Sequence, residues 1–404
     1  MGRTGVIAGP LAILLYSFLL GGVFMQFPAK KLGFGFMRMP LTDANNQKSI
    51  DVAQVEKMVD LFMERGYTYC DTAWMYHDFM SEETVGKVVV DRYPRDSFTI
   101  ATKMPDMMLK SSDEVAKIFA KQQEKLHTDY FDYYLVHDMN NVNYEKAKKF
   151  GVLEFVKAKR SSGEIKCLGF SCHDTPEFLD KVLTENPYFE FVQLQINYLD
   201  WESAGIQARK CYEVCEKHNQ KVIVMEPVKG GTLANPPEQV KTMLKKAHAD
   251  WSPAEWAIRF AASLKNVAVV LSGMSNFEQL DENTTFMQDF TPLSQDDFDL
   301  LLKAAEMIRQ TIAIPCTGCR YCVEASHCPQ NILIPNYFAL YNTNQLIPGR
   351  NFSPEIEYYS NYLNQGFGKA SACLACHACE RVCPQHIHIA EWMPKIASAM
   401  EKGQ

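Results

Sequence analysis

The chain has 404 residues, of which 47% are hydrophobic, 12% aromatic and 22% charged, as in ordinary globular proteins. This length predicts two or three domains, and the composition excludes a wholly disordered or fibrous chain. The formal net charge of −7 argues against a nucleic-acid partner, because such proteins need a basic surface to displace counterions from phosphates.

Residues 1–24 form a hydrophobic leader with more than one interpretation. Residues 5–24 carry no charge, and this is the length that a membrane-spanning helix needs. A secretory signal is disfavoured because no small-residue cleavage site follows. A membrane anchor would leave the remaining chain in the cytoplasm, because more basic residues follow the leader than precede it. The interpretation that we favour is that Met25 is the true start.

Residues 25–299 show the alternation of a (β/α)8 barrel, with short β-branched runs between longer segments of helical periodicity. The eight predicted strands are 33–38, 67–71, 98–103, 131–137, 165–170, 191–196, 221–225 and 267–271. Amphipathic helices are predicted at 51–65, 113–126, 144–160, 205–218 and 253–263. Eight such units indicate an α/β TIM barrel. An open doubly wound sheet is the alternative, but no glycine-rich nucleotide motif follows the first strand.

Four polar residues lie at or just after the C-terminal ends of three neighbouring predicted strands, where TIM barrels carry their chemistry. Asp71 ends the second strand and Tyr76 follows it, while Lys103 and His137 end the third and fourth strands. Each residue alone has an ordinary structural explanation, such as a helix cap, a packing aromatic or a buried imidazole. Their convergence on one mouth of the barrel predicts a catalytic site.

The sequence resembles the aldo-keto reductase family over nearly the whole barrel. The matching motifs are Asp71-Thr72-Ala73-Trp74-Met75-Tyr76, Ser81-Glu82, Ala101-Thr102-Lys103, Leu135-Val136-His137, Gly169-Phe170-Ser171, Gln193, Glu226-Pro227 and Ser272-Gly273-Met274. The resemblance implies reduction of an aldehyde or ketone by hydride from a nicotinamide cofactor, usually NADPH, with NADH as the alternative. It also implies that Asp71, Tyr76, Lys103 and His137 are the catalytic residues.

The chemistry of carbonyl reduction supports these roles, because the carbonyl oxygen gains negative charge as it accepts hydride and needs a proton donor beside it. Tyr76 is the expected acid, and the Lys103 ammonium is expected to lower its pKa from the ordinary value of about 10. Asp71 would hold Lys103 in place. His137 would orient the carbonyl oxygen, and Trp74 would form a wall of the substrate pocket.

The same resemblance implies a set of cofactor-binding residues: Ser171 and Gln193 at the nicotinamide carboxamide, Lys229, Gly230 and Gly231 near the pyrophosphate, and Gly273, Ser275, Gln279 and Asn283 at the adenosine end. Two features depart from the family pattern. Cys172 and His173 follow Ser171 where many members carry Asn. Residues 25–31 are too short for the hairpin that usually plugs the bottom of the barrel, so we expect a looser closure there.

Residues 300–404 are predicted to form a small α+β ferredoxin-like iron–sulfur domain. The chain has thirteen cysteines, and two runs lie in this part: Cys316-x2-Cys319-x2-Cys322-x5-Cys328-Pro and Cys373-x2-Cys376-x2-Cys379-x3-Cys383-Pro. The second run is the bacterial ferredoxin pattern. In two-cluster ferredoxins, the fourth cysteine of each run binds the other cluster.

We therefore expect two [4Fe–4S] clusters with crossed ligation, one on Cys316, Cys319, Cys322 and Cys383 and the other on Cys373, Cys376, Cys379 and Cys328. Tetrahedral zinc is the alternative, but zinc modules usually show two separated cysteine pairs. Clustered thiol ligands fit a reducing compartment better than a disulfide framework, and we expect a cytoplasmic protein.

A barrel of this family followed by a ferredoxin-like domain resembles a bacterial and archaeal branch whose substrates are mostly undefined. Nicotinamide delivers two electrons as one hydride whereas each cluster accepts one, so exchange between them normally needs a flavin, and no flavin site is evident. We favour a carbonyl reductase in which the clusters are structural, sensory or a docking module. The alternative is an electron-transfer protein that links the barrel to a ferredoxin-like redox partner.

Overall fold

The computed structural model describes residues 27–310 except 45, and beyond them 313–314, 316, 321–324, 326, 328–345, 353–383 and 385–401. The leader and Cys319 therefore lie outside the described residues, and the interpretations of residues 1–24 stay open. Within the described part of the chain, none of the helices combines the length and the apolar character that crossing a membrane requires.

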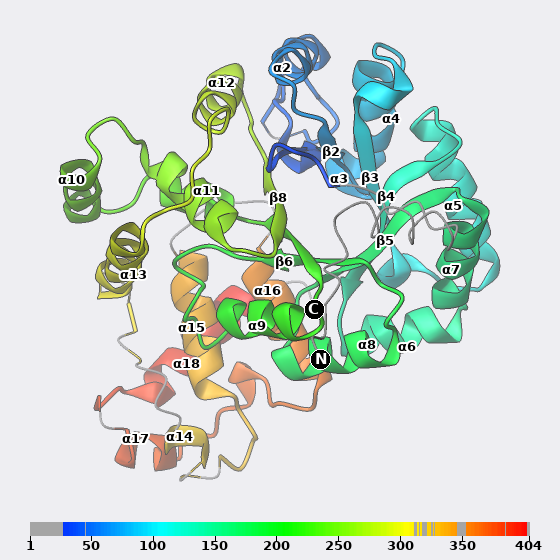
Figure 1. The fold of residues 1–404 in the computed structure, drawn as a ribbon. Coiled ribbons are helices and arrows are strands. Elements are labelled where there is room, and N and C mark those ends of the chain that lie inside the picture. Colours follow the sequence, from blue (N-terminus) through cyan, green and yellow to red (C-terminus); the bar gives the residue numbers. More distant parts are fainter. Residues whose placement is uncertain are drawn as a thin grey trace, which may run out of the picture.

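Eight parallel strands close into a barrel in chain order, as predicted (Figure 1). The strands are β1 (Leu32–Gly35), β2 (Tyr69–Asp71), β3 (Thr99–Met104), β4 (Phe131–Met139), β5 (Ile165–Cys172), β6 (Phe191–Gln195), β7 (Lys221–Met225) and β8 (Val267–Ser272). Strand β8 closes the barrel on β1, with Leu32 opposite Val270. The first strand ends earlier than predicted, because Phe36–Arg38 forms a 3-10 turn.

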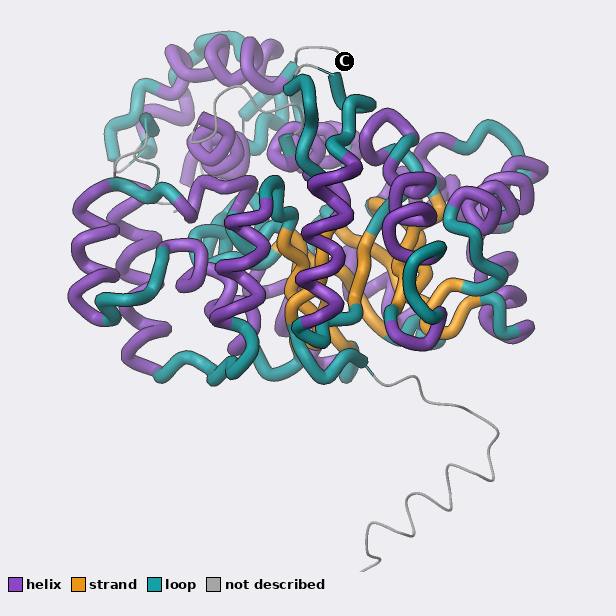
Figure 2. The backbone as a smooth tube through the Cα atoms, turned by 90° about the horizontal axis from the view of Figure 1, so that it is seen from above, coloured by secondary structure: helices purple, strands orange, loops and turns teal. Residues whose placement is uncertain are grey.

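Helices surround the strands, as Figure 2 shows from above. They are α2 (Val52–Glu64), α3 (Tyr76–Phe79), α4 (Ser81–Val85), α5 (Asp113–Lys125), α6 (Asn141–Lys149), α7 (Val152–Ser162), α8 (Pro176–Glu185), α9 (Ala208–Lys217), α10 (Glu238–Ala247), α11 (Pro253–Ser263), α12 (Phe277–Phe286) and α13 (Gln295–Gln310). The predicted helix 144–160 is two helices, because Gly151 takes a left-handed conformation (φ 73°) between α6 and α7.

The bottom of the barrel is filled by one aromatic side chain from the segment before β1. Phe27 packs on Tyr133 and Phe191, with ring centres 5.5 and 6.3 Å apart, and joins the cluster of inward-facing side chains inside the strands. This apolar contact covers part of the bottom of the barrel. The looser closure expected there stays a prediction.

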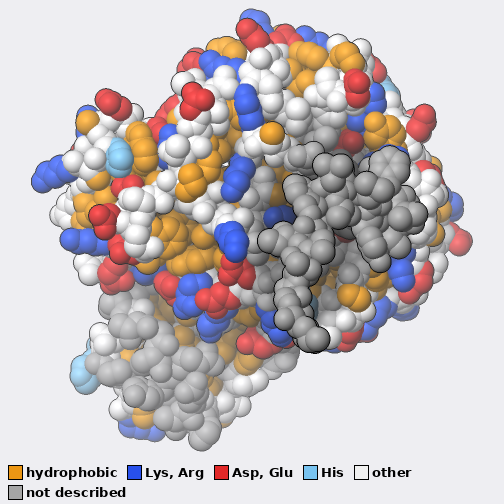
Figure 3. Space-filling model, in the orientation of Figure 1, with side chains coloured by type: hydrophobic (Ala, Val, Ile, Leu, Met, Phe, Trp, Pro, Cys, Tyr) orange, Lys and Arg blue, Asp and Glu red, His pale blue; other side chains and the backbone are white. Residues whose placement is uncertain are grey.

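Beyond α13 the regular elements of the described residues are helices, and strands of an α+β domain are not among them. These helices are α14 (Tyr321–Glu324), α15 (Ile334–Gln345), α16 (Pro354–Asn364), α17 (Ala378–Arg381) and α18 (Ile389–Met400). Two of them contact the barrel directly: Tyr362 on α16 donates to the Gly205 carbonyl at 2.7 Å, and Asn336 on α15 donates to the Ala204 carbonyl at 3.0 Å. The C-terminal helices thus pack on the loop after β6. On the face in Figure 3, acidic, basic and hydrophobic side chains are interspersed.

Candidate active site

The centre of the site is a buried ion pair between the ends of β2 and β3. Lys103 Nζ lies 2.7 Å from Asp71 Oδ1 and also donates to the Thr72 carbonyl at 2.7 Å, and both charged side chains are at most 3% exposed. Burial raises the pKa of Asp71. Burial works to lower the pKa of Lys103, but the Asp71 carboxylate and Tyr76 outweigh it and raise that pKa. Lys103 therefore keeps its proton.

Tyr76 lies against this pair at the start of α3. The Lys103 ammonium is 5.1 Å from the centre of the Tyr76 ring, and the ring meets His137 edge to face at 6.2 Å. Burial raises the pKa of Tyr76, and Lys103 opposes that rise without reversing it. The expectation that Lys103 brings this pKa below its ordinary value is therefore wrong for the protein by itself.

His137, at the end of β4, is a neutral imidazole. Its pKa is well below the ordinary value, because the ring is buried and the charge of Lys103 and the nearby His173 disfavour protonation. Its Nδ1 is buried without a hydrogen-bond partner among the described residues. A neutral ring of this kind can donate one N–H to a carbonyl oxygen without adding charge to the site.

A cavity of about 250 Å³ lies at the same end of the barrel, between the loops that follow β1, β7 and β8. Its lining includes Arg38, Glu226, Gly230, Gly231, Gly273, Ser275, Gln279, Glu282 and Asn283. Toward the barrel centre, the buried Gln193 side chain leaves Oε1 without a partner among the described residues. Ser171 Oγ accepts a hydrogen bond from the Asp138 backbone at 2.8 Å.

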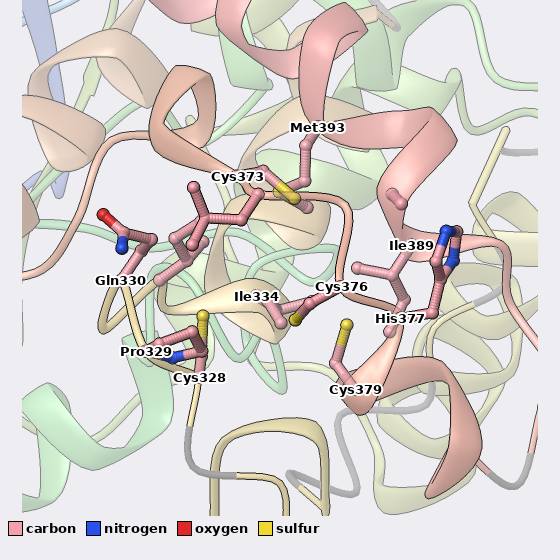
Figure 4. Close-up of a pocket in the computed structure, with 13 residues that line it drawn as sticks. Cys328, Pro329, Gln330, Ile334, Cys373, Cys376, His377, Cys379, Ile389 and Met393 are labelled. Carbon is pink, nitrogen blue, oxygen red and sulfur yellow. The ribbon is translucent and has the colours of Figure 1, made fainter.

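In the C-terminal region, four cysteines face one cavity (Figure 4). They are Cys328, from the first run, and Cys373, Cys376 and Cys379, from the second. The rest of the lining is mostly apolar and includes Ile332, Ile334, Ile389 and Met393. Thiols around an apolar cavity are the donor set that iron–sulfur clusters use.

A family model described as the aldo/keto reductase family matches residues 31–306, more than half of the chain. The chain belongs to the aldo/keto reductase family. A second model, the 4Fe-4S dicluster domain, matches residues 315–388. This aldo/keto reductase is thus an oxidoreductase with a C-terminal iron–sulfur domain.

Known relatives agree with the assignment. The chain is 25% identical over 252 residues to the 9,11-endoperoxide prostaglandin H2 reductase of Trypanosoma cruzi, a match covering 61% of this chain and 82% of the relative. An uncharacterized oxidoreductase of Bacillus subtilis, YqkF, is 24% identical over 286 residues, covering 63% of this chain and 85% of its own.

Solved structures show the same fold. The holo form of aldo-keto reductase AKR11C1 from Bacillus halodurans matches with a TM-score of 0.56 at 21% identity, over 69% of this chain and 95% of the other. An aldo/keto reductase from Klebsiella pneumoniae in complex with NADP and acetate matches with a TM-score of 0.54 at 22% identity, over 68% and 90%.

For one expected cofactor residue of this aldo/keto reductase, the position near the pyrophosphate stays a prediction. Lys229 is absent from the lining of the 250 Å³ cavity. Its ammonium is instead buried between Asp200, at 2.7 Å, and Glu355 of α16, at 3.2 Å. Two carboxylates draw the lysine side chain away from the cavity, while Gly230 and Gly231 after it do line the cavity.

Arg38 was missed by the motif comparison. It lies just after β1, lines the cavity and pairs with Glu226 across it, with Nη2 2.9 Å from Oε1. A lone basic residue after the first strand gives no signal in the sequence, because its position over the cavity depends on a partner far along the chain.

His77 was also missed, although it directly follows Tyr76. Its Nε2 accepts from the Met39 backbone N–H at 3.1 Å, and its Nδ1 lies 3.0 Å from the Gln47 carbonyl, so the ring carries its proton on Nδ1. Residues 77–79 all have positive φ values of 49–72°. Because such backbone is strained, these two bonds are what hold the turn that presents Tyr76.

The departure after Ser171 has a structural explanation. The His173 ring packs edge to face on Tyr358 of α16 at 5.7 Å, and the His173 carbonyl accepts from Asn361 at 2.9 Å. This segment faces the C-terminal helices. Trp74 lies beside Phe79 and under the Lys125 ammonium, 4.4 Å from the ring centre, and its place in a substrate wall stays a prediction.

Proposed function

We propose that this protein reduces an aldehyde or a ketone with hydride from NADPH or NADH. The observation that carries the proposal is the contact of Asp71, Lys103, Tyr76 and His137 at the mouth of the barrel. Two similar proteins support it, since one is a prostaglandin H2 reductase and the structure of the other, from Klebsiella pneumoniae, contains NADP.

The cofactor fits the residues present. The unpartnered Gln193 Oε1 matches the amide donor of a carboxamide, and Ser171 lies on the neighbouring strand β5. Gly230, Gly231 and Gly273 leave room for a backbone approach to phosphates. Ser275, Gln279 and Asn283 offer polar groups at the adenosine end. A bound nicotinamide would supply the hydride.

The protein's own residues would handle the proton. The Tyr76 hydroxyl donates its proton to the carbonyl oxygen as negative charge develops there, so the O–H bond of Tyr76 breaks as the O–H bond of the alcohol forms. The Lys103 ammonium stabilises the phenolate that remains, and Asp71 keeps Lys103 charged and in place. The neutral His137 orients the carbonyl oxygen with an N–H donor.

The test is Tyr76→Phe, which keeps the ring and removes the acid. We expect kcat for reduction of a panel of aldehydes and ketones to fall at least about 100-fold while the Kd for NADPH stays within about twofold. Tyr130→Phe is the matched control, because Tyr130 directly precedes β4 at the opposite end of the barrel from His137. Wild-type activity in Tyr76→Phe would refute the assignment of the acid.

For the iron–sulfur domain, we propose two [4Fe–4S] clusters with the crossed ligation predicted above. The grouping of Cys328 with Cys373, Cys376 and Cys379 around one cavity supports one of the two sets. For the other set, helices α14 and α17 lie against each other, which brings the segments of Cys322 and Cys383 near. Cys319 lies outside the described residues.

A second candidate function is electron exchange with a ferredoxin-like protein. The observation in its favour is that Cys376 and Leu374, beside the cysteine cavity, are exposed, Leu374 by 63%. The two candidate functions, carbonyl reduction and electron exchange, are distinguished by an anaerobic titration of the cluster-loaded protein with NADPH. The visible absorbance of the clusters is monitored during the titration. We expect no bleaching, because hydride arrives as an electron pair whereas each cluster accepts one electron. Bleaching would favour electron transfer.

A further inference from the structure

Helix α16 belongs to the iron–sulfur domain, yet one of its faces packs on the mouth of the barrel. Besides the contacts of Tyr358 and Asn361 with His173, Gln365 just after the helix donates to Asp174 Oδ1 at 2.9 Å. His173 and Asp174 directly follow β5, at the strand end where the candidate active site lies. The helix therefore borders the same end of the barrel as the catalytic residues.

The carboxylate of Glu355, in the first turn of α16, lies against the loop that follows β7. Glu355 Oε1 lies 3.2 Å from Lys229 Nζ, which also lies 2.7 Å from both carboxylate oxygens of Asp200. All three side chains are at most 1% exposed. An ammonium buried this deeply needs its carboxylate partners, since water cannot replace them.

The ion cluster fixes a turn with an unusual backbone. Lys229, Gly230 and Gly231 have φ values of 50°, 61° and 98°, three left-handed residues in a row. Glycine adopts this conformation freely but lysine does not, so the anchored side chain compensates for the strain at Lys229. Gly230 and Gly231 line the cavity assigned to the cofactor.

The cluster is also hydrogen-bonded to Glu226, another residue that lines that cavity. Asn197 donates to Asp200 Oδ2 at 2.7 Å and to the Glu226 carbonyl at 3.1 Å. Glu226 in turn pairs with Arg38 across the cavity. Hydrogen bonds thus connect Glu355 of α16 with both the glycine turn and the rim of the cavity.

We propose that Glu355 is a positioning residue for the nicotinamide cofactor: through Lys229, helix α16 of the iron–sulfur domain holds the 229–231 turn in the conformation that receives the cofactor. The inference rests on the proposed function, because it requires that the cavity binds NADPH or NADH. Glu355 is not among the residues that line the cavity, and it acts through Lys229.

The test uses Glu355→Gln in the full-length, cluster-loaded protein. Calorimetric titration with NADPH and NADH should show binding weakened about five- to tenfold, since the turn is no longer held before binding. At saturating cofactor, kcat should stay within about twofold, so the effect appears in KM and Kd. Glu355→Asp keeps the charge and should restore part of the affinity. Glu391→Gln is the matched control, because it removes the same charge from an exposed position of α18.

The following results would overturn the proposal that Glu355 positions the cofactor, or the proposed function on which it rests. Unchanged affinity in Glu355→Gln would overturn the inference. Iron content and thermal unfolding are measured alongside, and if Glu355→Gln loses clusters, Lys229→Gln takes its place with the same expected loss of affinity. An equal loss in Glu391→Gln would also overturn the inference. If the wild type binds neither NADPH nor NADH, the proposed function itself fails, which is a different result.

Discussion

At the scale of single residues, burial and charge act against each other on Tyr76. The hydroxyl is buried, which disfavours the phenolate, and the Lys103 ammonium beside it favours the phenolate. Burial is the larger of the two and raises the pKa of Tyr76. The result is an acid that stays protonated over the physiological range, next to an imidazole whose pKa is well below its ordinary value.

This balance predicts how reduction depends on pH. Tyr76 acts in its protonated form, which exists below its pKa; since that pKa is raised above 10, activity should persist to pH 9 and fall only at higher pH. His137 acts in its neutral form, which exists above its lowered pKa, so no acid limb is expected near pH 6.5. The measurement is kcat/KM for carbonyl reduction from pH 5 to 10, with NADPH binding measured at each pH as the control. An alkaline limb centred near pH 7 would contradict the assignment.

At the scale of elements, the barrel could be predicted because most strands are short runs of buried apolar residues, several of them β-branched, that alternate with amphipathic helices. The end of β1 and the break at Gly151 could not be predicted. At Gly151 the reason is that amphipathic periodicity continues through both α6 and α7. Single glycines end helices in some contexts and are tolerated in others, and packing decides between the two.

The grouping of the candidate catalytic residues could also be predicted, because strand order alone brings Asp71, Lys103 and His137 to neighbouring strand ends. Lys229 shows what strand order cannot predict, namely the direction of a side chain. Its residue number places it correctly in the turn after β7, but the direction of its side chain is set by Glu355, which lies 126 residues away along the chain. The same holds for His77, whose partners in residues 39 and 47 lie in an irregular loop.

At the scale of the whole molecule, the C-terminal region makes two kinds of long-range contact. It packs on the barrel, and its two cysteine runs, which are far apart in sequence, come together. Helix α13 spans the predicted boundary at 299/300 and packs on α10 and α11 of the barrel, while α16 packs on the mouth. Within the iron–sulfur domain, Cys328 and Cys373 line the same cavity, with 44 residues between them. Cluster ligation would therefore tie together two segments that the chain itself leaves far apart, and closing so long a loop constrains the unfolded chain.

That arrangement yields a prediction for Cys328→Ser. If ligation is crossed, the variant loses the fourth ligand of the cluster held by the second run and should retain about four of about eight iron atoms per chain. It should also unfold at a lower temperature, because the binding free energy of one cluster, and with it one of the two links between the cysteine runs, is lost. Iron analysis and thermal unfolding under anaerobic conditions test both points.

The matched control is Cys215→Ala. Cys215 is buried on α9 of the barrel and lies outside both cysteine runs, so its removal should leave the iron content unchanged. The distribution of iron distinguishes the ligation schemes: if ligation is not crossed, Cys328→Ser disturbs the cluster of the first run, and Cys376→Ser in addition removes the second. With crossed ligation, both substitutions remove ligands of the same cluster. The single variant Cys328→Ser and the double variant Cys328→Ser/Cys376→Ser should therefore contain equal amounts of iron.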